Sequence, residues 1–146
     1  MKNQNPIIEK LLAHIFAECD PVNREAAFDS MLDECYSFDA VGGPFAHMCP
    51  SRVLAECDPT AYRCGVNDYA DGQDWSEIGT ETYQDDDIAR ARDEFCDGLR
   101  DELQALETEL EDEQAADEPD AGEIARLESA IAAKNDEIEA CENYAF

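Results

Sequence analysis

The first pattern along the chain is a stripe of apolar residues at helical spacing near the N-terminus. Asn5 and Pro6 match an N-cap followed by a first helical residue, and proline fits that position because its missing N–H would have no partner within the helix. The stripe consists of Ile7, Ile8, Leu11, Leu12, Ile15 and Phe16. This spacing places the apolar side chains on one face, so we predict a core-facing helix that ends near Cys19.

Three later segments also begin with a proline in the first helical turn, at Pro21, Pro50 and Pro59. We expect the three helices to run to about Tyr36, Leu54 and Tyr69, respectively. The stretch from Asp71 to Tyr83 contains Gly79 and two threonines, and it predicts an irregular connector.

From Asp85 the apolar positions recur over a much longer stretch. The first seam consists of Ile88, Phe95, Leu99, Leu103, Leu106 and Leu110; the second, after a break at Pro119, consists of Ile124, Leu127, Ile131, Lys134, Ile138 and Cys141. Two helices with facing seams and a short connection fold back on each other. We therefore predict an all-α fold in which a small helical globular domain (1–75) and a connector (76–84) precede a long acidic antiparallel helical hairpin (85–146).

Each seam of this coiled-coil-like hairpin is narrow. A narrow apolar seam needs a further surface to cover it. We therefore expect the hairpin to pack on the first domain or on a second copy of itself, which makes a homodimer one expected assembly.

Charge changes this picture more than any other property. The chain carries 37 acidic and ten basic residues, a formal net charge of -27, and residues 85–142 hold 22 of the acids but only five basic residues. Such a field repels nucleic acid and attracts proteins that bind nucleic acid. We therefore expect no direct DNA or RNA binding, and we predict a basic nucleic-acid-binding protein as the partner.

The density of carboxylates in this region is of the same order as that of phosphates in DNA. B-DNA carries about one charge per 1.7 Å of axis, and a net charge of -17 over a hairpin about 45 Å long gives roughly one per 2.6 Å. The expected phosphate surrogates are Glu94, Asp97, Asp101, Glu102, Glu109, Asp112 and Glu113. This density predicts a non-enzymatic DNA-mimic-type inhibitor that occupies the basic nucleic-acid-binding surface of a host defence nuclease, CRISPR-type complex or regulator.

Other chemistry has little support in the sequence. No phosphate-binding glycine loop, nucleophile elbow or zinc-protease helix occurs, so we expect no enzymatic activity. The seven cysteines are odd in number and predict reduced thiols. The nearest approach to a metal cluster, His47, Cys49, Cys57 and Cys64, lacks closely spaced ligand pairs, so we expect neither metal nor cofactor. Without a run of about 18 apolar residues, we expect a cytoplasmic protein and no membrane partner.

The segment from Pro50 to Asp71, PSRVLAECDPTAYRCGVNDYAD, resembles small acidic proteins of bacteriophages and other mobile elements. The resemblance covers about a sixth of the chain. It implies a mobile-element setting, with the host cytoplasm as the site of action. Because such elements often encode acidic inhibitors of host defence, the resemblance implies an anti-restriction or anti-CRISPR role.

Two other interpretations stay open. In the first interpretation, the protein is a coiled-coil adaptor or phage structural protein, and its seam residues, such as Leu106 and Ile131, recruit a partner helix. In the other, the carboxylates serve only solubility or adaptation to high salt, since three lysines accompany 37 acids. The uneven concentration of charge and the seven cysteines argue against salt adaptation.

Overall fold

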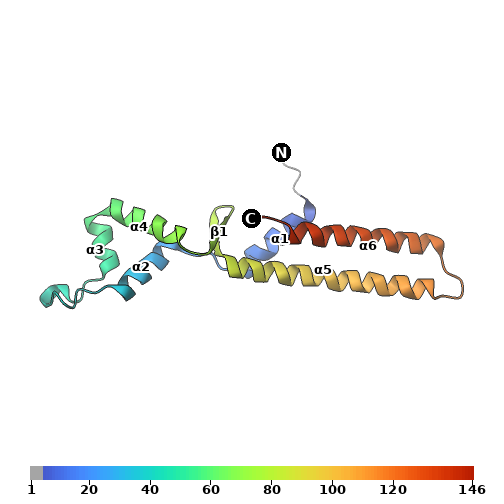
Figure 1. Cartoon of the computed structure of the whole chain (residues 1–146), viewed down its shortest axis with the longest axis horizontal. Coiled ribbons are helices and arrows are strands. Elements are labelled where there is room, and N and C mark those ends of the chain that lie inside the picture. The colour runs from blue at the N-terminus through green and yellow to red at the C-terminus, as the bar shows by residue number, and fades with distance from the viewer. Residues whose placement is uncertain (1–4) are drawn as a thin grey trace. The chain divides into compact units, whose positions relative to one another are not determined.

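The computed structural model describes residues 5–146. Within that range the chain forms six α-helices, a 3-10 helix and one two-stranded sheet (Figure 1). The elements are α1 (Pro6–Glu18), α2 (Arg24–Cys35), η1 (Gly43–Phe45), α3 (Pro50–Cys57), α4 (Pro59–Asp71), β1 (Trp75–Ile78), β2 (Glu81–Gln84), α5 (Asp85–Gln114) and α6 (Ala121–Glu142). The prediction of a mostly helical chain is confirmed, and the small sheet is a departure from an all-α fold.

The chain divides into two compact units. In the described part, the long-helix unit consists of α1 and the chain from Asp86 to Phe146, and the mixed unit runs from Pro21 to Asp85. This division differs from the expected one at 1–75, 76–84 and 85–146. The first helix belongs with the long helices, and the expected connector is part of the mixed unit.

The apolar stripe of α1 explains why this helix joins the long-helix unit. Ile7, Ile8, Leu11 and Ile15 are all buried, and α1 contacts α6. It also contacts α5: the ring centroids of His14 and Phe95 are 5.6 Å apart, and the Cys19 thiol donates a hydrogen bond to the Asp87 carbonyl oxygen at 3.4 Å. The first helix thus covers part of the narrow apolar seams.

Helices α5 and α6 lie side by side (Figure 1). Arg100 pairs with Glu142, and Glu102 pairs with Lys134 at 2.7 Å. The residue number of the partner on α6 therefore falls as the residue number on α5 rises. In the connection, the Asp120 side chain caps α6 by accepting the N–H of Gly122 at 2.7 Å. These contacts align the two helices in opposite directions.

The mixed unit is built around Phe28 of α2, whose side chain is 5% exposed. Its ring centroid lies 5.7 Å from that of Tyr62 and 5.9 Å from that of Tyr69, both in α4. Asp33 links α2 to the start of α3, because its carboxylate accepts the N–H and the hydroxyl of Ser51, each at 2.9 Å. Helices α2, α3 and α4 therefore contact one another pairwise.

The expected connector (76–84) was wrongly predicted as irregular. Strands β1 and β2 pair in antiparallel register, with Ile78 opposite Glu81. The two-residue loop between them begins with Gly79, which has a φ of +71°, and glycine at the first loop position is the pattern of a type II′ turn. The aromatic and β-branched residues on both sides of this glycine were the available signal for a hairpin.

The expected start of the second helix at Pro21 was also wrong. The helix begins three residues later because the Asn23 side chain is the N-cap and accepts the Ala26 N–H at 3.0 Å. The Val22 N–H instead donates to the Thr82 carbonyl oxygen at 2.7 Å, which extends the chain beside β2. The other predicted proline starts are confirmed, at Pro6, Pro50 and Pro59.

Candidate functional site on the long helices

All seven carboxylates predicted as phosphate surrogates lie on α5. At about 100° per residue, four of them fall on the side opposite the buried Leu99 and three lie closer to the seam. The outward four are Glu94, Asp97, Asp101 and Asp112, and the other three are Glu102, Glu109 and Glu113. Six of the seven side chains are exposed, and Glu113 is half-buried.

The outward carboxylates do not form a continuous row. Gln104 and Thr108 occupy the outward positions between Asp101 and Asp112, and the Thr108 hydroxyl donates to the Gln104 carbonyl oxygen at 2.9 Å. The surface therefore consists of a proximal group (Glu94, Asp97, Asp101) and a distal group (Glu109, Asp112, Glu113). At 1.5 Å per residue, Asp97 and Asp112 are about 22 Å apart along the axis. Glu111, which is not among the predicted surrogates, is exposed beside the distal group.

Three of the predicted surrogates already have partners within the chain. These are Asp97 with Arg100 (2.6 Å), Glu102 with Lys134 (2.7 Å), and Glu113, whose carboxylate accepts the Asp120 N–H (2.8 Å). Glu94, Asp101, Glu109 and Asp112 form no ion pair within residues 5–146. The charge of Glu109 helps to raise the pKa of Arg126, so Glu94, Asp101 and Asp112 are the carboxylates left to a basic partner.

The basic side chains of α5 and α6 are tied to neighbouring acids or to an aromatic ring. Lys134 lies in the α6 seam with 18% of its side chain exposed, and its hydrogen bonds to Glu102 and then to Glu137 raise its pKa. The hydrogen bond with Glu123 raises the pKa of Arg126, and that bond lowers the pKa of Glu123. These cations therefore stay charged and cancel only the carboxylates next to them.

Helix α6 contributes less charge to the surface than α5. It carries six acidic residues, whereas α5 carries 13. Its exposed positions include several small uncharged residues: Ala125, Ser129, Ala132, Ala133 and Asn135. The candidate binding surface is therefore one side of α5.

The cysteines divide by unit. Cys35, Cys49, Cys57 and Cys64 are exposed and lie in the mixed unit, whereas Cys19, Cys96 and Cys141 are buried and lie in the long-helix unit. All seven thiols are free. Burial raises the pKa of the buried three, that of Cys141 to about 11.

The histidine and cysteines considered as metal ligands are not brought together as a metal site. Across the described range, no three His, Cys, Asp or Glu side chains are arranged to hold a metal ion. The helices described for residues 5–146 also include none with the length and apolarity to cross a membrane. Comparisons of the chain with protein-family models, with curated proteins and with solved structures give no match.

Proposed function

We propose that the protein is a non-enzymatic DNA-mimic-type inhibitor, whose acidic α5–α6 hairpin occupies the basic nucleic-acid-binding surface of a host protein. The observation that carries the proposal is the outward side of α5, where Glu94, Asp101 and Asp112 are exposed and form no ion pair with any residue from 5 to 146. The partner is a defence nuclease, a CRISPR-type complex or a regulator in the host cytoplasm. The inhibitor acts by occupation alone and catalyses no reaction.

Binding would follow the physics of phosphate contacts. Lysine and arginine side chains that hold a DNA backbone form charge-assisted hydrogen bonds with oxygen anions, and a carboxylate offers the same kind of acceptor. Since the proximal and distal groups are about 22 Å apart, the partner should have two basic subsites at that separation. The uncharged Gln104 and Thr108 lie between the proximal and distal groups of α5, and we expect them to contribute little to the affinity.

Competition with DNA tests the proposal. The protein is used at low salt to capture its partner from a host extract, and the purified partner is then loaded with a fluorescent DNA duplex. We expect the protein to displace the duplex and to lose affinity steeply as salt rises, as phosphate contacts do. Failure to displace the duplex would refute the proposal.

A matched pair of triple variants separates a specific surface from general acidity. The first replaces Glu94→Gln, Asp101→Asn and Asp112→Asn on α5; the second replaces Glu128→Gln, Asp136→Asn and Glu139→Gln, which are exposed on α6. Both remove three charges and keep side-chain shape. We expect the first to weaken displacement by at least about tenfold, which is 1.4 kcal/mol, and the second to have a much smaller effect. Equal effects would mean that only the total charge matters.

A second candidate function rests on the far part of the seams. Leu99, Leu127 and Ile138 are buried, whereas five other seam residues are half-buried: Leu103, Leu106, Leu110, Ile124 and Ile131. A coiled-coil adaptor would use this remaining apolar strip to recruit a partner helix. Binding that is insensitive to salt and is abolished by Leu106→Gln, in a variant that keeps its helicity, would favour the adaptor.

A further inference from the structure

The loop between α2 and α3 contrasts with the rest of the chain in charge and in exposed apolar surface. From Tyr36 to Ser51 there is one Asp, Asp39, and no Glu, Lys or Arg, in a chain of net charge -27. This apolar loop (residues 36–49) holds four large hydrophobic side chains that are extensively exposed: Tyr36 (61%), Val41 (65%), Phe45 (52%) and Met48 (45%). Within residues 5–146, only Phe16 and Phe146 are comparable.

The loop holds its shape through its own hydrogen bonds. The Val41 N–H donates to the Phe38 carbonyl oxygen, and the Met48 N–H donates to the Phe45 carbonyl oxygen, both at 3.0 Å. Gly42 has a φ of +72°, a conformation that glycine adopts at no steric cost. An ordered loop loses little further entropy on binding, so its exposed side chains are prepared for a contact.

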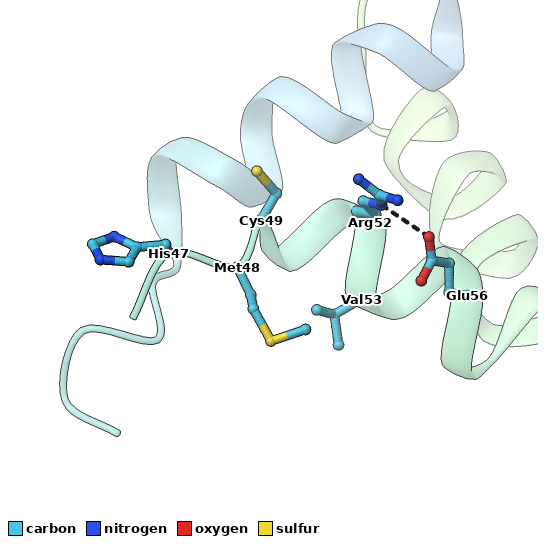
Figure 2. A pocket seen from close by; sticks show the side chains of 6 residues that line it. All are labelled: His47, Met48, Cys49, Arg52, Val53 and Glu56. Atoms are coloured by element: carbon cyan, nitrogen blue, oxygen red, sulfur yellow. Dashed lines mark hydrogen bonds and ion pairs between the residues drawn. The ribbon is translucent and has the colours of Figure 1, made fainter. Parts of the chain in front are cut away.

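A hollow of about 310 Å³ lies at the end of this loop, where α3 begins. It is lined by His47, Met48, Cys49, Arg52, Val53 and Glu56. In Figure 2 the side chains of Met48 and Val53 extend toward each other, and Arg52 pairs with Glu56. In that pair, at 2.8 Å, the charges of Arg52 and Glu56 offset each other.

We propose that the apolar loop and this hollow form a contact between two copies of the chain. Phe45 of each copy enters the hollow beside Met48 and Val53 of the other. A two-fold contact uses the same patch on both partners and therefore needs a projection and a hollow in one patch. The loop supplies both features within a few residues.

The patch suits a second copy because it carries both the projection and the hollow that a two-fold contact requires. Two chains of net charge -27 repel wherever their carboxylates face each other, and the apolar loop is where this repulsion is smallest. A basic protein would be drawn to the carboxylates of α5 rather than to this loop. The proposal is independent of the inhibitor function.

The contact is small, because four side chains and one hollow place it at the low end of interface sizes, below about 1,200 Å². We therefore expect a weak and reversible dimer. Salt should strengthen it, since screening reduces the repulsion between the two acidic chains. This salt dependence has the opposite sign from that expected for partner binding through α5, so the two proposals fail independently.

Sedimentation equilibrium of the full chain at low and high salt tests the contact. A thiol reductant is present because Cys49 lines the hollow and is exposed, so that no intermolecular disulfide forms. We expect a monomer–dimer equilibrium whose association constant rises with salt. A chain that stays monomeric at high salt and high concentration would overturn the proposal, as would a dimer that salt weakens.

Three variants locate the contact. Phe45→Asp and Met48→Asp should each lower the association constant by at least about tenfold, which is 1.4 kcal/mol. Thr60→Asp, at an exposed position in α4 that does not line the hollow, adds the same charge to the same unit and should leave dimerisation unchanged. Circular dichroism checks that all three variants keep their helicity. A dimer that survives both loop substitutions, or that Thr60→Asp disrupts equally, refutes the assignment.

Discussion

At Gly65, the lack of a side chain determines how closely α4 can pack on α2. A Cβ atom at this position would lie 2.6 Å from Cζ of Phe28. The Phe28 ring is buried against Tyr62 and Tyr69, and a close-packed ring has little room to move aside. Gly98 in α5 is the opposite case, because no atom lies within 4 Å of the Cβ that would be added there.

We expect Gly65→Ala to lower the free energy of unfolding of the mixed unit, because the overpacked ring must shift at a cost of about 1–3 kcal/mol. Alanine gains roughly 1 kcal/mol over glycine inside a helix, which leaves a net loss of up to about 2 kcal/mol. Gly98→Ala, which has the gain without the clash, should raise stability by about 0.5–1 kcal/mol. Urea unfolding measures both changes, and a stabilised Gly65→Ala variant would contradict the packing.

Tyr62 makes the stability of the folded protein depend on pH in the alkaline range. Its hydroxyl donates a hydrogen bond to the Asp29 carboxylate at 2.7 Å, and this bond, together with partial burial, raises the pKa of Tyr62 to about 12. The folded state thus favours the protonated phenol. The resulting stabilisation is complete below pH 10, the ordinary pKa of tyrosine, and is lost as pH rises through about 12.

Tyr62→Phe should therefore reduce the loss of stability between pH 10 and 12. Tyr36→Phe, which changes an exposed tyrosine, serves as the control and should follow the unchanged protein. Denaturant midpoints measured across this range give the slopes. If Tyr62→Phe and the unchanged protein lose stability in parallel, the hydrogen bond does not control this titration.

At the scale of elements, the sequence predicts where helices begin far better than what they pack against. The starts at Pro6, Pro50 and Pro59 are local signals, and they were predictable for that reason. The partner of α1 was not, because an apolar stripe shows that a face is buried and says nothing of the surface that buries it. The start at Pro21 failed because Val22 bonds to Thr82, 60 positions further along the chain.

The candidate site was likewise predictable from the sequence only in part. Its acidic character and its place on α5 follow from composition and spacing. Which carboxylates are already paired does not, because Glu102 meets Lys134 across 32 positions and Arg100 meets Glu142 across 42. The register of α6 against α5 decides these pairs, and no short-range pattern encodes it.

Lys134 tests the pairing of α5 with α6. Lys134→Glu would put a third carboxylate beside Glu102 and Glu137, and each new repulsion costs about 1 kcal/mol at 4 Å in water. With the lost ion pairs, we expect unfolding of the long-helix unit to become easier by about 1–3 kcal/mol at low salt, and salt should reverse part of the loss. Lys134→Met should be nearly neutral. Thermal unfolding at two salt concentrations measures both, and a salt-independent loss would point to packing as the cause.

At the scale of the whole molecule, the two units carry separate reporters. The only tryptophan, Trp75, lies in β1 of the mixed unit, and α5 and α6 supply most of the helical residues. We expect Gly65→Ala to move the urea transition seen by tryptophan fluorescence and Gly98→Ala to move mainly the transition seen by circular dichroism. If either variant moves both transitions equally, the chain unfolds as one cooperative body.

Because the exposed and buried thiols lie in different units, thiol labelling can measure how fast the long-helix unit opens. A maleimide reagent should attach at once to the four exposed cysteines of the mixed unit. The other three are shielded, and their raised pKa values keep the reactive thiolate scarce. A fifth label can therefore form only after the long-helix unit has opened far enough to expose one of these thiols. The delay between the fourth and fifth mass increments, read by mass spectrometry in the native state, times that opening without denaturant or an added probe.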